Sequence, residues 1–576
     1  MTFLTERPAA VRRARVSRRA LADAVVIGLI GFTLSVALSW VPSVWYDESA
    51  TIIAATRSWS DLGRMLGTVD AVHGLYYALM HLWFDLVGYS PFTLRLPSAV
   101  ATGLAAALIV PLVSRLATRR TAVYAGLLFT LLPRVTWMGG EGRSFALTTA
   151  FAVLLSLVFL AAWRRSGTQP GTTRAGWWVR SRWWALYALL AVLFTGLFLY
   201  VALLVVAHGV TAVWTTVRAR RQTTGRARSG APAAATAATT ATTATTSAIS
   251  APAAAQGRDA SMTGAGLRGW LAASVTAGIV VLPFAYAVVS QSGQVSWIDP
   301  ISSRTFTDVF IVQWFMENTA FSVVGWTLII LGITVLLSRA RSTATLPAAP
   351  TIIAPGDTAV RAWPSLLELT LPWLTVPTLG LIAVSLVMTP VFSPRYLVFA
   401  APAAAILMAV TVTALPGRAM RLSALALCVL LLAPTYIGQR MPEAKQNSSW
   451  SEVSALLASE RAAEPGGGAA DGVIYGPVRQ HASATTRVIA YSYPEGFEGT
   501  VDLNIRTPAA QTDGLWETRY PLAEVQDRFE GLDTVWLVTS NKQDWRPSIR
   551  SKLGALGFTF DTEWNLTGVN VLRFTR

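Results

Sequence analysis

Long apolar stretches alternate with short arginine-rich segments along the first 440 or so residues of the chain. A membrane-spanning helix needs about 20 predominantly apolar residues. By this measure we expect eleven spans, at about 21–41, 96–114, 121–139, 145–163, 183–199, 201–216, 269–289, 320–337, 364–388, 397–415 and 422–438. The segment 183–216 is too long for one helix and has arginines at both ends, so we expect a tight hairpin there that turns near Tyr200.

The arginine clusters predict the orientation of these spans. Five arginines between Arg12 and Arg19 precede the first apolar stretch, and no A-x-A-like cleavage site follows before Trp45. We therefore expect a retained first span with a cytoplasmic N-terminus. Later clusters, such as Arg115 to Arg120, should also be cytoplasmic. An odd number of spans then places the C-terminus outside, in a multi-pass protein of the cell membrane.

Several segments do not have the pattern of a membrane helix. Residues 219–268 contain an Ala/Thr/Pro tract that has too few large apolar residues to form a core, so we expect a disordered cytoplasmic linker. Residues 341–360 resemble a shorter linker. The stretch 73–88 is apolar, but a crossing there would place the Arg115 to Arg120 cluster outside. We expect an amphipathic helix along the outer interface instead.

The last part of the chain has the pattern of a small water-soluble domain. From about residue 439 the apolar density falls, and DGVIYG, DTVWLVTS and GVNVLRFTR predict strands while RPSIRSKLGAL predicts a helix. The expected organisation is a transmembrane domain at 1–438 and an extracytoplasmic α/β domain at 439–576. The expected fold class is therefore an α-helical polytopic membrane protein with a small C-terminal α/β domain.

Composition agrees with this pattern and narrows the function. Hydrophobic residues make up 53% of the 576 residues and charged residues only 14%, against roughly a quarter in soluble domains. The net charge of +16 comes from arginines between apolar runs, so membrane topology explains it and no nucleic-acid partner is expected. With Cys428 as the single cysteine, the chain forms no internal disulfide and no cysteine-based zinc site.

Three polar groups are candidates for chemistry, each beside the outer end of a predicted span. Asp47 and Glu48 lie in WVPSVWYDESAT, Glu141 and Arg143 lie in WMGGEGRSFAL, and Arg395 lies in TPVFSPRYLVFAAP. Each group also has a purely structural interpretation. These are a helix cap for the first, a salt bridge at a helix end for the second, and an arginine that reaches lipid phosphate for the third.

The predicted orientation brings these groups to one depth on one side of the membrane, together with His73, Tyr76 and Tyr77. Carboxylates suit the deprotonation of a hydroxyl or the binding of a metal, whereas arginines bind phosphate bidentately. Together they favour a phosphate-linked substrate at the outer leaflet.

The order of these motifs resembles a known enzyme family. WYDE, HGLYYALMHLWFDLVG, LRLPSA, GEGRSFAL and SPRYLVFAAP resemble the GT-C glycosyltransferases of the protein mannosyltransferase and aminoarabinose transferase type, especially the actinobacterial family 39 glycosyltransferases or mannosyltransferases. The resemblance covers about residues 20–440. It implies a GT-C fold and a polyprenyl-phosphate sugar donor, with mannose the first expectation. The acceptor would be a hydroxyl of a cell-envelope glycan, lipid or protein outside the cytoplasmic membrane.

The resemblance also implies roles for individual residues. Asp47 is similar to the general base that activates the acceptor hydroxyl, with Glu48 as its partner, and Glu141 resembles the second acidic position. Arg143 and Arg395 are similar to residues that face the lipid phosphate. The family allows a divalent metal, Mg²⁺ or Mn²⁺, for which Asp47 and Glu141 are the candidate ligands.

The loop after the first span departs from the family's usual His-Pro-Pro-x-Tyr, because it reads His73-Gly74-Leu75-Tyr76. His73, Tyr76 and Tyr77 are the expected substrate-binding residues. In the C-terminal domain, aromatic residues that could stack on a sugar are Trp516, Trp536, Tyr491 and Tyr493, although core packing is also a role for them.

Other functions remain open from the sequence. A transferase for another lipid-linked sugar, such as arabinofuranose, fits the same residues. A lipid-linked sugar transporter or flippase would have charges at mid-membrane or on both faces, whereas the predicted spans contain few charges apart from Glu368. A non-catalytic scaffold would leave the order of motifs unexplained. The chemistry implied by the transferase is a single displacement at the anomeric carbon, with inversion and with phosphate as the leaving group.

Overall fold

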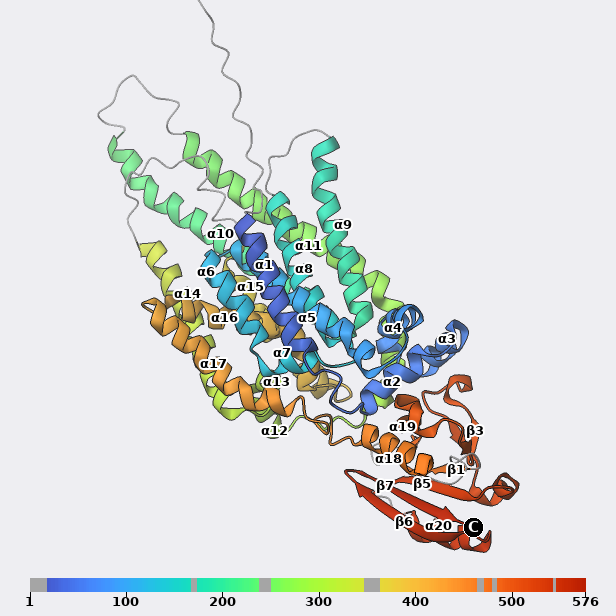
Figure 1. Ribbon diagram of the computed structural model, residues 1–576. Coiled ribbons are helices and arrows are strands. Elements are labelled where there is room, and N and C mark those ends of the chain that lie inside the picture. The colour runs from blue at the N-terminus through green and yellow to red at the C-terminus, as the bar shows by residue number, and fades with distance from the viewer. Residues whose placement is uncertain are drawn as a thin grey trace, which may run out of the picture.

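The computed structural model describes residues 18–166, 174–237, 250–345, 363–463, 471–478, 484–541 and 545–576. A bundle of long helices forms most of the molecule, and a small α/β domain lies at one end of it (Figure 1). This arrangement confirms the expected fold class.

Nine of the described helices are long and apolar enough to span a membrane. They are α1 (Arg18–Val36), α5 (Pro91–Ser114), α8 (Phe145–Ser166), α10 (Ala202–Ala237), α11 (Ser250–Ser290), α14 (Thr319–Thr345), α15 (Leu366–Val387), α16 (Ala401–Ala414) with the preceding η6 (Pro394–Ala400), and α17 (Arg418–Gly438). A shorter apolar segment, Ser181–Leu197, belongs to α9 (Arg174–Leu197). The helix breaks between Leu197 and Ala202, where the hairpin near Tyr200 was expected.

One expected span is divided in two. The segment 121–139 forms α6 (Arg119–Thr130) and α7 (Pro133–Met138), and Leu132 between them has an extended backbone. Pro133 has no N–H to donate and disfavours helical geometry at the residue before it, so the first helix ends ahead of it.

Much of the segment 219–268, for which we expected a disordered linker, is helical in the structure. The structure continues α10 to Ala237 and begins α11 at Ser250, while residues 238–249 lie outside the described part. Alanine has the highest helix propensity of all residues, so an alanine-rich tract without a core still forms helix where it extends a membrane span. Of the shorter segment 341–360, residues 341–345 belong to α14 and the rest lie outside the described residues.

Four short helices follow α1 at the end of the bundle that carries the C-terminal domain (Figure 1). They are α2 (Tyr46–Ala55), α3 (Trp59–Thr68), η1 (Ala71–His73) and α4 (Gly74–Val87). The last corresponds to the amphipathic segment expected at 73–88. Its tip exposes apolar side chains, with Leu86 77% exposed, as a helix that lies along a membrane interface would.

The C-terminal domain is built on a five-stranded sheet of order β2-β1-β5-β7-β6. β1 is parallel to both neighbours, whereas β7 is antiparallel to both of its own. The predicted strands and helix appear as β1 (Asp471–Tyr475), β5 (Thr534–Ser540), β7 (Val569–Thr575) and α20 (Arg546–Ala555). The sequence pattern did not predict the exposed edge strand β6 (Thr559–Leu566).

The domain's remaining elements surround this sheet. They are the small hairpin β3 (Ile505–Thr507) and β4 (Thr518–Arg519) and the helices α18 (Trp450–Ala463) and α19 (Arg487–Ser492), while β2 (Val501–Asp502) is the edge strand of the sheet itself. In the bundle, the short α12 (Arg304–Thr307) and α13 (Gln313–Phe315) precede α14.

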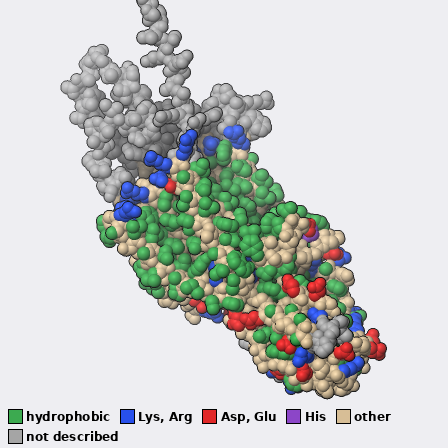
Figure 2. Space-filling model, in the orientation of Figure 1, with side chains coloured by type: hydrophobic (Ala, Val, Ile, Leu, Met, Phe, Trp, Pro, Cys, Tyr) green, Lys and Arg blue, Asp and Glu red, His purple; other side chains and the backbone are tan. Residues whose placement is uncertain are grey.

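Charge and apolar surface are distributed as the sequence predicted. Apolar side chains cover the sides of the bundle, and Lys and Arg side chains gather at the end away from the C-terminal domain (Figure 2). A membrane around the apolar band with the basic end in the cytoplasm satisfies the positive-inside rule.

Close packing of α1 against α5 depends on glycine. A Cβ atom at Gly103 would lie 2.7 Å from the carbonyl oxygen of Gly28, whereas a Cβ at Gly278, on α11, would meet nothing within 4 Å. Small residues of this kind let membrane helices approach closely.

We expect Gly103→Val to destabilise the protein by about 1–3 kcal/mol through overpacking, and Gly278→Val to leave stability nearly unchanged. The measurement is the thermal unfolding temperature of each variant in detergent. The two variants are a matched pair, because each replaces a glycine of a membrane helix by valine. Equal stability of the two variants would contradict the α1–α5 contact.

The orientation is tested by cysteine labelling with a membrane-impermeant reagent. In a Cys428→Ala background, Ser60→Cys on α3 should be labelled in intact cells, whereas Ser114→Cys at the opposite end of α5 should be labelled only after lysis. Both serines are exposed and the natural Cys428 is buried, so access depends on sidedness alone. The reverse pattern would invert the topology.

Candidate active site

A cavity of about 900 Å³ lies where the end of the bundle meets the short helices and the C-terminal domain. Residues from α2, η1, the α7–α8 loop, η6 and the segment 514–518 line it. Its acidic, basic and histidine side chains are Asp47, Asp70, His73, Arg143, Arg395 and Glu517. Another part of its wall is apolar and includes Val288, Val289, Trp297, Val384, Met388 and Val391.

Asp47 lies in the first turn of α2 and lines this cavity. The cap position of the helix is Trp45, and no side chain caps it, so the structure does not support the helix-cap interpretation of Asp47. The Asp47 carboxylate forms an ion pair with Arg395 at 2.8 Å and is 21% exposed.

Arg395 is held in η6 rather than extended toward lipid. Its side chain is 18% exposed and lies over the rings of Trp45 and Trp297, at 5.8 and 5.0 Å from their centroids. Its Nε has no hydrogen-bond partner among the described residues. The guanidinium therefore retains a donor at the cavity wall.

Arg143, in the loop between α7 and α8, is held by several hydrogen bonds, including a longer one of 3.4 Å to the Thr51 hydroxyl. It donates to His73 Nε2 at 2.8 Å, to the Tyr77 hydroxyl at 3.1 Å and to the Asp47 carbonyl oxygen at 3.1 Å. Tyr77 in turn donates to Asp70 at 2.7 Å. This network links α2, η1 and the α7–α8 loop through Tyr77 of α4, and so holds Asp47, His73 and Arg143 at one wall of the cavity.

The protonation of His73 follows from this network. Burial, together with the charges of Arg143 and Arg395, holds the pKa of His73 well below its usual range, so the ring is neutral near pH 7. Because Nε2 accepts a bond from Arg143, the proton lies on Nδ1. That buried nitrogen has no partner among the residues described.

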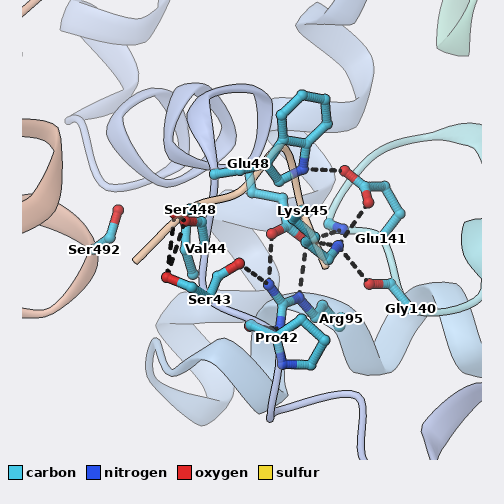
Figure 3. Close-up of polar contacts among 12 residues, drawn as sticks. Pro42, Ser43, Val44, Glu48, Arg95, Gly140, Glu141, Lys445, Ser448 and Ser492 are labelled. Atoms are coloured by element: carbon cyan, nitrogen blue, oxygen red, sulfur yellow. Dashed lines mark hydrogen bonds and ion pairs between the residues drawn. The ribbon is translucent and has the colours of Figure 1, made fainter. Parts of the chain in front are cut away.

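Glu48 and Glu141 occupy a different place from Asp47. With Arg95 and Lys445 they form a buried ion cluster beneath the cavity (Figure 3), and none of these four side chains is among the cavity's lining residues. Lys445 lies between the carboxylates, at 2.8 Å from Glu48 and 2.6 Å from Glu141. Arg95 contacts Glu48 through two bonds of 2.9 and 2.6 Å.

The two carboxyl groups of the cluster differ in pKa. Burial alone would raise the pKa of Glu48, but the charges of Arg95 and Lys445 outweigh it and hold the pKa at about 2. Burial raises the pKa of Glu141, against the opposing effect of Lys445 and with a further increase from Glu48. Glu48 is therefore the ionised partner of both cations.

The remaining aromatic candidates divide between wall and core. Trp516 lines the cavity and packs on Tyr46 with ring centroids 4.7 Å apart. Tyr76 is buried in the core below the wall and does not line the cavity. Trp536, Tyr491 and Tyr493 belong to the packing of the C-terminal domain, and the Tyr493 hydroxyl accepts a bond from the Val44 N–H.

Sequence reasoning missed Lys445 and, of the segment 514–518, every cavity-lining residue except Trp516. One signal was present: Lys445 is one of only three lysines in the sequence, beside 44 arginines. No local pattern indicates that Glu517, from the C-terminal domain, lines the same cavity as Asp47.

Comparisons with known proteins identify the fold. No protein-family model matches the sequence, and no curated protein sequence matches it. The structure is similar to that of ArnT from Cupriavidus metallidurans bound to undecaprenyl phosphate. The TM-score is 0.50 and the identity 12%, over 97% of this chain and 98% of that chain. This similarity shows a GT-C type of fold.

A weaker similarity is to the oligosaccharyltransferase AglB from Archaeoglobus fulgidus in complex with an inhibitory peptide and a dolichol-phosphate. Its TM-score is 0.45 and its identity 11%, over 94% of this chain and 71% of that chain. Another structure of this archaeal enzyme, in complex with Zn and sulfate, has a TM-score of 0.44 and 12% identity, over 93% of this chain and 69% of that chain.

The residues around Asp47 do not fit the divalent metal that the family resemblance allows. Among the described residues no group of three or more His, Cys, Asp or Glu side chains is arranged to hold a metal ion. Glu141, the second candidate ligand, contacts Lys445 and the indole N–H of Trp45 instead. A metal ion bound by Glu141 would have to displace the ammonium group of Lys445.

The buried ion cluster should be essential for stability. Lys445→Met leaves two buried carboxylates without their shared cation, and breaking a buried pair costs about 3–5 kcal/mol. Lys552→Met, at an exposed lysine of α20, is the matched control. Thermal unfolding at pH 7 should show a large loss for the first variant and almost none for the second. Equal unfolding temperatures would show that the cluster contributes little.

Proposed function

We propose that this protein is a membrane glycosyltransferase that moves a sugar from a polyprenyl-phosphate donor to an acceptor hydroxyl. The observation that carries the proposal is the presence of one carboxylate, Asp47, and two guanidinium groups, Arg143 and Arg395, on the wall of one partly apolar cavity. Such a transfer needs a base for the hydroxyl and cations for the departing phosphate.

Unpaired N–H groups support the phosphate-binding role. Arg143 Nε, Arg395 Nε and His73 Nδ1 are buried and have no partner among the described residues. A buried donor without a partner costs about 1–3 kcal/mol. An anion with several acceptor oxygens would recover this free energy, and a phosphate group has that chemistry.

The apolar part of the wall supports a lipid donor. It is formed by the ends of α11 and α15 and by the segments after them, and some of its side chains are also exposed, Met388 by 59% and Trp297 by 51%. An apolar surface that runs from the cavity to the outside of the bundle suits a polyprenyl chain whose phosphate is bound within.

In the proposed reaction, Asp47 accepts the proton of the acceptor hydroxyl as its oxygen attacks the anomeric carbon. The bond from that carbon to the phosphate oxygen breaks, and Arg143 and Arg395 stabilise the charge that develops on the lipid phosphate. A single displacement of this kind inverts the anomeric configuration. Arg395 contacts Asp47 before the donor arrives, so the phosphate would share or replace that contact.

Glu48 and Glu141, expected among the catalytic residues, take a positioning role in this proposal. Glu48 accepts a bond from the Gly142 N–H at 2.8 Å, next to Arg143, and follows Asp47 directly in α2. The buried ion cluster therefore fixes the backbone of both the base and one phosphate-binding residue. Tyr77 orients Arg143 through its hydroxyl, and the ring of Tyr76 packs beside that of Tyr77, with centroids 6.4 Å apart.

Mannose is the sugar that the sequence resemblance favours, and arabinofuranose is an alternative that uses the same residues. Purified protein incubated with a panel of polyprenyl-phosphate sugars distinguishes them by which donor is consumed. A transporter would move a lipid-linked sugar across a vesicle membrane without forming a new glycosidic bond, and that result would contradict the proposal.

Substitution of Asp47 separates catalysis from binding. Asp47→Asn keeps the shape but removes the base, and general-base losses are about 10²- to 10⁴-fold. Donor binding should be retained, because the proposed phosphate contacts belong to Arg143 and Arg395. The measurement is sugar transfer and donor affinity on the same preparation, with Asp527→Asn, an exposed residue of the C-terminal domain, as control. Full turnover in well-folded Asp47→Asn would remove Asp47 from the mechanism.

Arg395→Ala should have the opposite effect. Loss of a charge-assisted contact to phosphate should weaken donor binding by about 1.5–3 kcal/mol. Donor affinity measured by calorimetry, with the exposed Arg304→Ala as control, checks this expectation. Unchanged donor affinity would assign the phosphate to another part of the cavity.

A further inference from the structure

A second, smaller pocket adjoins the candidate active site. It has a volume of about 180 Å³. It lies between α2, the sheet of the C-terminal domain and the connector between α17 and α18, residues 439–449. Trp45, Tyr46 and Gln446 line both this pocket and the larger cavity. The two spaces are therefore neighbours, and Asp47 follows directly after the two aromatic residues that separate them.

The lining of the smaller pocket differs sharply from that of the larger one. None of its described lining residues is an Asp, Glu, His, Lys or Arg, whereas six such side chains line the larger cavity. Its wall combines aromatic rings with amides and hydroxyls, among them Trp45, Trp450, Gln446, Asn447, Thr486 and Asn541. The described part of this lining therefore offers no ion pair to a charged ligand.

The amide groups of this pocket are available to a ligand. The side chains of Gln446, Asn447 and Asn541 form no hydrogen bond with any other side chain or backbone group in the described part of the chain. Gln446 and Asn447 also have left-handed backbone conformations, with φ of 56° and 55°. This conformation costs free energy in residues other than glycine and is concentrated at binding sites.

From these observations we infer that the smaller pocket is the acceptor subsite and that the acceptor is an uncharged saccharide. An amide side chain offers both a donor and an acceptor to neighbouring sugar hydroxyls, and the apolar face of a sugar ring packs on an indole. A phosphorylated acceptor would find no cation among the described residues of this lining, and an unpaired charge there is costly. The volume suits about one sugar unit, with the reactive hydroxyl directed past Trp45 and Tyr46 toward Asp47.

This inference rests on the proposed function and gives the C-terminal domain a role in it. The pocket exists only when that domain is docked, because its walls come from both sides of the interface. Ser448 Oγ donates to the Val44 carbonyl at 2.6 Å, and Ser449 Oγ donates to the Thr567 carbonyl at 2.8 Å, so the connector is bonded to both sides. The domain would thus select the acceptor, while the membrane bundle binds the donor.

The test measures acceptor binding without the donor. Calorimetric titrations of the full-length protein use three probes of similar size: neutral mannose oligosaccharides, the same oligosaccharides carrying a phosphate, and serine- and threonine-containing peptides. The variants are Gln446→Ala and Asn541→Ala, and the control is Asn565→Ala at an exposed position of β6 away from the pocket. We expect the neutral oligosaccharide to bind. Its affinity should fall about tenfold in each pocket variant, as for the loss of a hydrogen bond, and should not change in the control.

The inference is overturned if no neutral oligosaccharide binds, if the phosphorylated or peptide probe binds more tightly, or if the pocket variants bind as the control does. Donor binding, measured in parallel, should be equal in Asn541→Ala, Asn565→Ala and the unmodified protein, because neither residue lines the larger cavity. Failure of the proposed function would be a separate result: no polyprenyl-phosphate sugar would bind or be consumed by the unmodified protein, whatever the oligosaccharide titration shows.

Discussion

The ammonium group of Lys445 lies between two carboxylates that are fully buried, and the arrangement of the whole site depends on that contact. Glu48 comes from α2, Glu141 from the loop before α8, and Lys445 from the connector to the C-terminal domain. Arg95, at the start of α5, adds bonds to the carbonyl oxygens of Ser39 and Pro42, both at 2.7 Å, just after α1. One group of charges therefore joins four segments that are far apart in the sequence. In a low-dielectric interior such a group is stable only when every charge has a partner.

This cluster divides the polar residues of the outer end into two groups. The four charged side chains of the cluster are paired with one another, do not line the cavity and hold the backbone in place. Side chains with donors still unpaired, Arg143, Arg395 and His73, lie on the cavity wall. A binding site needs both groups, because groups that contact a ligand must be held by neighbours that do not move.

The position of the cavity at the junction of bundle and domain matters for the chemistry. A lipid-linked donor has an apolar chain that belongs in the membrane and a charged phosphate that does not. A site with an apolar wall formed by helix ends and a cationic wall formed by loops suits both parts at once. In the proposed function, the smaller pocket on the far side of Trp45 and Tyr46, with no charged residue in its described lining, would receive the polar acceptor.

The sequence by itself determined most of the long apolar helices, because a span must satisfy its backbone internally and bury some 20 apolar residues in lipid. The exception is 121–139, which divides before Pro133. The sequence also predicted the strands β1, β5 and β7 and the gathering of the polar motifs at one end. It did not determine which of two adjacent carboxylates faces the cavity. Neighbouring helical residues point about 100° apart, so Asp47 faces the cavity and Glu48 the interior only because of how α2 packs. The partner that decides this, Lys445, lies 397 residues away, and only the tertiary structure brings it there.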